Sequence, residues 1–258
     1  NGSTAPLGDG LLASVDGPLA NDTISYSYDE FGRVVERKIN DTANDLDVVF
    51  DALGRVTSET NPLGTFSYSY DGNTGRVTEV SNGSGFKTAY EYYPNVPTVP
   101  GTGNGDRRLK AIKHYTSTST LDAQHDYSYN ASGNITQWTQ RWAGLTAGND
   151  YKLRYDGADQ LIGAERWNTA TGNLDRQDAW GYDLAGNRGL AQASIRQGGG
   201  TYTADLVRST HNDLNQITGQ TGGAGVMRFE GTVNEPATID VEGQTASVRR
   251  DPSGLGYR

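Results

Sequence analysis

Polar and apolar residues alternate along most of this chain in short stretches, and each stretch ends at a cluster of Asp, Asn and Gly. The stretch YSYDEFGRV, residues 26–34, is representative. Successive strand residues point to opposite faces, so Tyr26 and Tyr28 would place two rings on one side of a strand. Few windows place apolar residues at helical spacing without an intervening Gly, Asn or Pro. The pattern therefore predicts β-strands joined by glycine-containing turns.

The same stretch recurs along the chain, and eight copies can be aligned, numbered here as repeats 1 to 8. In repeat 4 the loop PNVPTVPGTGNGD replaces the tight turn, and the last repeat, STHNDLNQI, is degenerate. The central aromatic recurs every 20 to 22 residues in the first four repeats and at wider spacing afterwards. The repeats occupy residues 26–34, 48–56, 68–77, 90–96, 127–135, 153–161, 180–188 and 209–217.

Each repeat has the chemistry of a β-hairpin. An Asp at the first turn position accepts backbone N–H bonds, and a Gly three residues later tolerates the positive φ that closes the turn. One hairpin is marginal by itself, but hairpins stacked edge to edge would share their edges and faces. We expect the rings of neighbouring repeats to lie side by side as a ladder of cross-strand aromatic pairs.

The Asp29–Arg33 pair recurs with the turn, which favours a structural pair over a catalytic site. In repeat 5 the turn survives although Asn130 and Asn134 replace the acid and the arginine. We assign a structural role to the recurring positions Tyr28, Asp29, Gly32, Arg33, Phe50, Asp51, Gly54, Arg55, Tyr70, Asp71, Gly75, Arg76, Tyr129, Gly133, Tyr155, Asp156, Tyr182, Asp183 and Gly186.

Composition narrows the function. The 258 residues include 31 acidic and 22 basic ones, which argues against nucleic-acid binding. There is no cysteine, so disulfides, thiolate nucleophiles and cysteine-based zinc sites are excluded. No apolar run approaches the roughly 18 residues that a membrane-spanning helix needs, and no membrane insertion is expected. The N-terminus lacks a signal-peptide pattern, and we expect the chain to be a piece of a longer protein.

The repeated unit, with its variants YDLAGNR and YNASGNI, resembles the YD repeat of the Rhs family. That family is similar to the repeat regions of bacterial polymorphic toxins, the C component of insecticidal toxin complexes and teneurins. The resemblance covers residues 24–218. It implies an all-β fold in which stacked hairpins form a curled, spiralling sheet that closes as a hollow shell. This chain would supply an arc of the shell wall.

Four parts are expected along the chain. An N-terminal extension covers residues 1–23, the YD repeats cover 24–218 and a Gly-rich linker covers 219–225. Residues 226–258 look like the opening strands of a small β-sandwich-like module, because Ala237, Ile239 and Val241 alternate before a turn.

Chemistry outside the repeats is sparse. The stretch DPSGL at 251–255 resembles the element at which Rhs core domains cleave themselves, so Asp251 is an autocleavage candidate, although Asp-Pro-Ser-Gly is also an ordinary turn sequence. The three histidines have no metal-binding spacing, and no metal or cofactor is expected. Stacking on glycans is possible at Trp138, Trp142, Trp167 and Trp180, with packing within the sheet as the alternative.

These observations predict a non-enzymatic scaffold, extracellular or at the cell surface, that encloses or presents a toxin or effector. Its expected partners are further YD repeats of the same protein, other copies and an enclosed effector domain. A surface adhesin that binds glycans is the first alternative. An Rhs core that cleaves itself at Asp251–Pro252 is the second.

Overall fold

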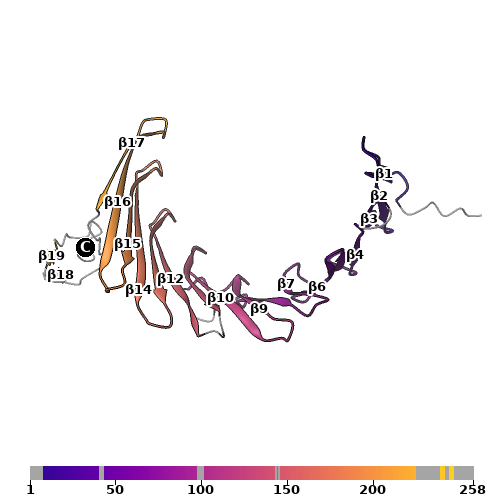
Figure 1. Ribbon diagram of the computed structural model, residues 1–258, viewed down its shortest axis with the longest axis horizontal. Coiled ribbons are helices and arrows are strands. Elements are labelled where there is room, and N and C mark those ends of the chain that lie inside the picture. Colours follow the sequence, from indigo (N-terminus) through magenta and orange to yellow (C-terminus); the bar gives the residue numbers. More distant parts are fainter. Residues whose placement is uncertain are drawn as a thin grey trace, which may run out of the picture. The chain divides into compact units, whose positions relative to one another are not determined.

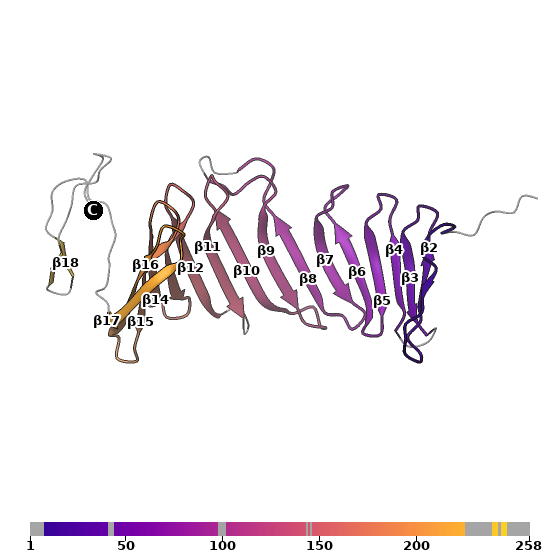
Figure 2. The same ribbon diagram turned by 90° about the horizontal axis from the view of Figure 1, so that it is seen from above.

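The fold is all-β. The computed structural model describes residues 8–40, 44–97, 102–142, 144, 146–224, 239–241 and 244–246. Antiparallel pairing links strands β1 to β17 into one sheet (Figures 1 and 2). The described residues form no helix, so they contain none that could cross a lipid bilayer. The predicted fold class is confirmed.

All eight repeats form hairpins, as the sequence predicts. In each one the turn of the repeat joins two neighbouring antiparallel strands. The hairpins are β2 (Ile24–Tyr28) with β3 (Val34–Ile39), β4 (Leu46–Phe50) with β5 (Val56–Asn61), β6 (Gly64–Tyr70) with β7 (Val77–Asn82), β8 (Lys87–Tyr92) with β9 (Leu109–Tyr115), β10 (Leu121–Tyr129) with β11 (Ile135–Trp142), β12 (Ala147–Tyr155) with β13 (Leu161–Asn168), β14 (Leu174–Tyr182) with β15 (Arg188–Arg196) and β16 (Tyr202–His211) with β17 (Ile217–Ala224).

The chain divides into two compact units. The first comprises residues 1–161 and 165–174, and within it the strands follow one another side by side in chain order (Figure 2). The second comprises residues 162–164 and 175–258 and holds the hairpins of repeats 7 and 8. Two short strands, β18 (Ile239–Val241) and β19 (Gln244–Ala246), pair separately from the large sheet.

The structure describes most of the predicted linker, part of the N-terminal extension and little of the C-terminal module. The linker expected at 219–225 is wrong as far as Ala224, because β17 continues to that residue and pairs with β16 as far as Asp205. Ladder hydrogen bonds involve only the backbone, so a Gly-rich stretch can extend a strand whose partner is long enough. The N-terminal extension contributes β1 (Ser14–Val15), which pairs with the start of β2. Apart from β18 and β19, the module expected at 226–258 lies outside the described residues.

The hairpin turn in repeats 1 and 2 has the predicted chemistry. In repeat 1 the Asp29 carboxylate accepts the backbone N–H groups of Phe31 and Arg33, both at 2.9 Å, and Gly32 adopts a φ of 75°. Repeat 2 reproduces this arrangement with Asp51 and Gly54. In repeats 6 and 8, Asp159 and Asn215 occupy the positive-φ position in place of glycine, as these short polar side chains tolerate.

Repeat 3 departs from the predicted turn. Its extra residue moves the positive φ to Gly72, at 52°, so Gly75 does not have the role expected of it. The Thr74 hydroxyl donates to the Asp71 backbone carbonyl at 2.8 Å and accepts the N–H of Arg76 at 3.2 Å. The Asp71 side chain instead faces Arg107 of repeat 4 at 3.4 Å. In this longer turn the Thr74 hydroxyl, and not the Asp carboxylate used in repeats 1 and 2, accepts the backbone N–H of the arginine.

The sheet is a single layer without a conventional hydrophobic core. Among the described residues, Ala111 is the buried hydrophobic side chain, at 1% exposure. In some strands one face is nevertheless more covered than the other. In β6, for example, Phe66, Tyr68 and Tyr70 are half-buried, whereas the serines and the threonine between them are exposed. Coverage must come from side chains of neighbouring strands, because no second layer of described residues packs on this face.

A recurring hydrogen bond joins the hairpins of repeats 3 to 6 to the preceding hairpin. The hydroxyl of the central tyrosine donates to the backbone carbonyl of the first residue of the previous return strand, as in Tyr70 to Val56 at 2.5 Å. Tyr28 of repeat 1 makes the same bond to Leu12 of the N-terminal extension, at 2.7 Å. The other examples are Tyr92 to Val77 at 2.8 Å, Tyr129 to Leu109 at 2.8 Å and Tyr155 to Ile135 at 2.9 Å.

The Tyr70 hydroxyl is therefore expected to stabilise the contact between repeats 2 and 3. The Tyr70→Phe variant should lower the free energy of unfolding by about 1 kcal/mol, because the Val56 carbonyl loses its side-chain donor. Tyr68→Phe, in the same strand, is the matched control, since the Tyr68 hydroxyl makes no hydrogen bond with the described residues. Urea denaturation compares the two variants, and equal losses would contradict the assigned role.

Candidate functional site

The residue that follows the turn glycine links one repeat to the next. The Arg33 guanidinium pairs with Asp29 at 2.6 Å in its own turn and also lies over the Phe50 ring of repeat 2, 4.3 Å from the centroid. Arg55 likewise lies over the Tyr70 ring of repeat 3 at 4.4 Å. A guanidinium over an aromatic face is attracted by the ring quadrupole. Each arginine therefore belongs to two hairpins.

Arg55 shows the most extensive link. Its guanidinium pairs with Asp51 in its own turn at 2.6 Å. Its Nη1 donates to the backbone carbonyls of Gly72 and Thr74 in the turn of repeat 3, at 2.7 and 2.6 Å. With the Tyr70 ring, these contacts hold the turns of repeats 2 and 3 together. We call this arrangement of acid, arginine and next ring the inter-repeat clamp.

The later repeats use a different link at the same position. Asn134 of repeat 5 donates to the Asp159 carboxylate of repeat 6 at 2.6 Å. In the second unit, Asn187 of repeat 7 donates to Asn215 of repeat 8 at 2.9 Å. A hydrogen bond between turns thus replaces the arginine clamp where the sequence has asparagine.

The long loop of repeat 4 also supports the following hairpin. The Gly103 N–H donates to the Tyr129 carbonyl at 3.0 Å, and Asn104 accepts the Tyr129 N–H at 2.8 Å. A Cβ on Gly103 would lie 1.6 Å from the Asn130 carbonyl oxygen, so only glycine fits there. Arg108 donates to the Gly103 carbonyl and lies 5.8 Å from the centroid of the Tyr129 ring. The loop and Arg108 thus link repeats 4 and 5, as the inter-repeat clamp links repeats 2 and 3.

The predicted ladder of stacked repeat rings is wrong for repeats 2 to 4. Phe50, Tyr70 and Tyr92 do not contact one another within residues 44–97, because a return strand separates each from the next. Two strand spacings amount to about 9–10 Å, which is beyond ring contact. For Phe50 and Tyr70, an arginine from the preceding repeat occupies that space.

A true aromatic stack lies further along the sheet, on strands β10 to β12. Trp138 is nearly parallel to Tyr127 on one neighbouring strand, at 9° and 6.3 Å, and to Tyr151 on the other, at 22° and 5.1 Å. His125 also stacks on Trp138, and the Trp138 indole N–H donates to its Nδ1 at 3.3 Å. Both faces of the Trp138 indole are thus covered by neighbouring rings.

The other tryptophans named as glycan contacts lie elsewhere. Trp142 is 40% exposed at the end of β11, and Trp180 is half-buried in β14. Trp167 has the Lys152 ammonium 4.8 Å from its ring centroid, and its indole N–H donates to Glu165 at 2.9 Å. The structure does not bring these four tryptophans into one surface within either unit. Glycan stacking by them stays a prediction.

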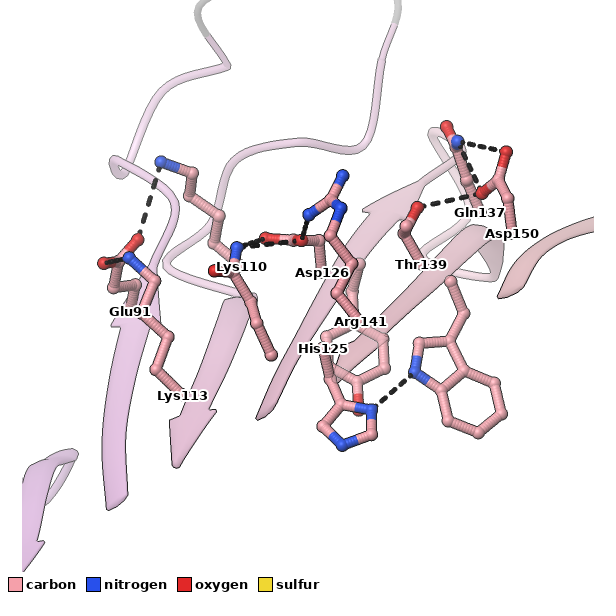
Figure 3. A network of polar contacts seen from close by, with 12 residues as sticks. Glu91, Lys110, Lys113, His125, Asp126, Gln137, Thr139, Arg141 and Asp150 are labelled. Carbon is pink, nitrogen blue, oxygen red and sulfur yellow. Dashed lines mark hydrogen bonds and ion pairs between the residues drawn. The ribbon is translucent and has the colours of Figure 1, made fainter. Parts of the chain in front are cut away.

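A charged strip crosses the opposite face of the same strands (Figure 3). Glu91, Asp126 and Asp150 lie in one cross-strand row, with Ala111 and Thr139 directly between them. These small residues keep like charges from facing each other directly, which would be destabilising.

Each carboxylate of the charged strip has partners. Glu91 pairs with Lys113 and, at 3.8 Å, with Lys110. Asp126 pairs with Arg141 at 2.6 Å and accepts from Gln124 at 2.7 Å. Asp150 accepts from Gln137 and Thr139, both at 2.8 Å. The strip thus has the organisation of a cross-strand ion-pair network.

The electrostatics agree with structural rather than catalytic roles. The hydrogen bond to Glu91 raises the pKa of Lys113, so its ammonium stays charged. The Arg55 backbone N–H, and then its guanidinium, lower the pKa of Asp51 although burial opposes this. Both shifts favour the ionised forms, whereas a general base needs a pKa near the working pH.

Two open grooves lie on the first unit. One, of about 270 Å³, is lined mainly by β6 to β9 residues such as Phe66, Lys87 and His114. The other, of about 340 Å³, is lined by residues that include Tyr90, Tyr92 and Arg107. No group of three or more metal-ligating side chains is found within the described ranges. The autocleavage candidate Asp251 lies outside the described residues.

Sequence reasoning found the hairpin turns but missed the links between them. The arginine clamp has a sequence signal, since Arg33 and Arg55 each precede a repeat with a central aromatic. The charged strip lacks such a signal, because its residues come from five strands with different spacings.

Comparison with known proteins gives one family match. Residues 50–87 match the family model described as RHS Repeat. A search of curated protein sequences finds no match.

Solved structures give the wider likeness. The crystal structure of TcdB2-TccC3-Cdc42 matches with a TM-score of 0.58 at 16% identity, covering 77% of this chain and 10% of that one. The crystal structure of TcdB2-TccC3 gives the same TM-score at 17% identity, with the same coverage of both chains. The Photorhabdus luminescens Tc holotoxin pore matches with a TM-score of 0.52 at 14% identity, covering 82% and 12%. This chain therefore spans about a tenth of the length of the chains that it resembles.

The inter-repeat clamp is expected to contribute strongly to stability. Arg55→Met should lower the free energy of unfolding by about 2 kcal/mol, because it removes charge-assisted hydrogen bonds and the contact with the Tyr70 ring. Arg37→Met is the matched control, since Arg37 is exposed and makes no contact of this kind with the described residues. Thermal and urea unfolding measure both variants, and a similar cost for the two would refute the clamp.

The lowered pKa of Asp51 predicts an acid-sensitive contribution at repeat 2. Because the folded pKa lies below the ordinary value of about 3.9, the stabilisation is present above that pH and is lost as pH falls through the folded pKa. Asp51→Asn should keep the turn, as Asn130 does in repeat 5, and should reduce the loss of stability on acidification.

The measurement is the melting temperature between pH 5 and pH 2 for the native chain, Asp51→Asn and Asp47→Asn. Asp47 is exposed in β4 and serves as the control. If the Asp51→Asn and Asp47→Asn profiles coincide, Asp51 has no special role in acid stability.

Proposed function

We propose that this chain of RHS repeats is a wall segment of an exported, hollow protein shell that encloses or presents an effector. In this view the chain acts as a scaffold and not as an enzyme. Its repeats would be continued by further repeats of the same protein or by other copies.

The observation that carries this proposal is the way one hairpin is attached to the next. Within the first unit, the tyrosine hydroxyls and arginine clamps each join a hairpin to its immediate neighbour. Such nearest-neighbour attachment places no limit on the number of hairpins, as in other repeat proteins. A sheet of this kind is suited to form a wall of any required length.

The fold likeness supports the same function. The chains that this one resembles belong to toxin-complex structures, and the match covers about three quarters of this chain. Since it spans about a tenth of those chains, a closed shell would require many more repeats than the eight present here. The proposed shell would therefore be built by the complete polypeptide that the gene encodes, and not by these eight repeats alone.

The test is to express the complete open reading frame that encodes this chain and to examine it by electron microscopy. A hollow particle whose wall contains these repeats is the expected result. Protease treatment should then leave any enclosed segment intact, while Arg55→Met together with Tyr70→Phe should make that segment more accessible. An extended ribbon, or a particle without an internal space, would exclude the shell.

The same material tests autocleavage at Asp251–Pro252. An intact-mass change at this bond that Asp251→Ala prevents would add a processing step to the scaffold. An unchanged mass would leave the chain without enzymatic activity at this bond.

A further inference from the structure

Two histidines meet where hairpin 4 joins hairpin 5. His114 lies on β9 and His125 on β10, on the same face of the sheet, with ring centroids 5.9 Å apart and planes at 85°. The β9–β10 pair is the direct connection between repeats 4 and 5. Any change in the charge of these rings therefore acts on the contact between two repeats.

The hydrogen bond from Trp138 fixes the neutral form of His125. An indole N–H can only donate, so the Nδ1 of His125 must accept with its lone pair, over 3.3 Å. Protonation of Nδ1 removes that lone pair and leaves two donors facing each other. His114 is held by Thr88, whose hydroxyl lies 3.0 Å from its Nδ1.

Few groups on this face offset a positive charge. The residues directly opposite His125 are Ile112 on β9 and Gln140 on β11, and both are neutral. On β10 itself, Tyr127 shares the face of His125, as expected for residues two apart. Asp122 and Lys87 line the groove that also contains His114, and Lys87 pairs with Glu79.

The nearest charged residues point the other way. Asp126 is adjacent to His125 but lies on the opposite face, where Arg141 binds it (Figure 3). Lys110 and Lys113 of β9 both pair with Glu91 on β8. These carboxylates are thus already matched by cations, and they compensate an imidazolium on the aromatic face only weakly.

We propose that the His114–His125–Trp138 cluster makes the junction between repeats 4 and 5 sensitive to acid. Protonation of His125 breaks the Trp138–His125 hydrogen bond and places a positive charge beside the His114 ring of the adjacent strand. The β9–β10 pair is then the part of the first unit that opens first on mild acidification. This inference does not rest on the proposed shell function.

The direction of the effect follows from the surroundings of His125. Burial, and secondly the neighbouring His114, lower the pKa of His125 from its ordinary value of about 6.5. A histidine with a lowered folded pKa binds protons more readily when unfolded. Its neutral form therefore stabilises the fold above about pH 6.5, and this stabilisation declines as pH falls below that value.

His211 provides a control within the same chain. The pKa of Asp183 in the second unit is lowered first by its hydrogen bonds from Asn187 and also by nearby His211, so a carboxylate lies close to this imidazole. Comparison of His125 with His211 separates the effect of this junction from a general effect of acid.

The experiment measures the melting temperature of the chain from pH 8 to pH 5 for the native sequence, His125→Gln, His114→Gln and His211→Gln. Glutamine can still accept the Trp138 N–H but does not titrate, so His125→Gln should lose most of the acid-induced fall. His114→Gln should lose part of it, and His211→Gln should behave like the native chain. Only slopes against pH are compared, so a variant that is less stable at every pH remains informative.

Hydrogen exchange locates the effect. Residues 109–129 should exchange faster at pH 5.5 than at pH 7.5, after correction for intrinsic rates, while residues 24–39 should not change. An NMR titration should place the pKa of His125 below the ordinary value of about 6.5. Equal pH slopes for His125→Gln and the native chain, or uniform exchange across both segments, would overturn the proposal.

Discussion

Each strand must be stabilised by its neighbours in the same sheet, because no second layer packs on it in the part of the chain that the structure describes. Among the described residues, Ala111 is the buried hydrophobic side chain, so burial in a core does not hold the hairpins in place. The tyrosine hydroxyl that bonds the previous return strand provides an attachment on the backbone. The arginine that extends from its own turn over the ring of the next repeat provides a second attachment, between side chains. Both act in chain order, from one hairpin to its neighbour.

The two faces of the first unit meet this constraint with different chemistry. On one face the rings of Tyr127, Trp138 and Tyr151 stack across three strands and cover one another. On the other, carboxylates alternate with small residues. These carboxylates form ion pairs with Lys113 and Arg141 and accept hydrogen bonds from neutral donors. Surface ion pairs contribute little one at a time, but a network across neighbouring strands restricts the register of the sheet. Aromatic coverage and charge pairing thus stabilise the same strands from opposite sides.

The sequence predicts the hairpins because their chemistry is local. The Asp29 carboxylate and Gly32 lie within one turn, and their spacing is visible in the chain. One inserted residue is enough to change this, since in repeat 3 the positive φ moves to Gly72 and away from Gly75. The reach of Arg55 into the next turn depends on a distance across strands, which the spacing of residues does not give. For the same reason the sequence predicts a ladder of repeat rings where arginine separates the rings. It predicts a linker at 219–225 because glycine composition does not show that a long partner strand is there to pair with.

The step of two strands per repeat has an evolutionary consequence. Adding or deleting one whole repeat returns the chain to the same border of the sheet, in the same direction, with the same side chains on each face. The repeat that becomes the new neighbour also carries a tyrosine and a residue after the turn glycine. That residue can contact the adjacent hairpin, either as arginine, as at position 33, or as asparagine, as at position 134. Duplication and loss of repeats are therefore nearly neutral for folding. Genes for such chains can change length readily, while a shift by a single strand would be eliminated by selection.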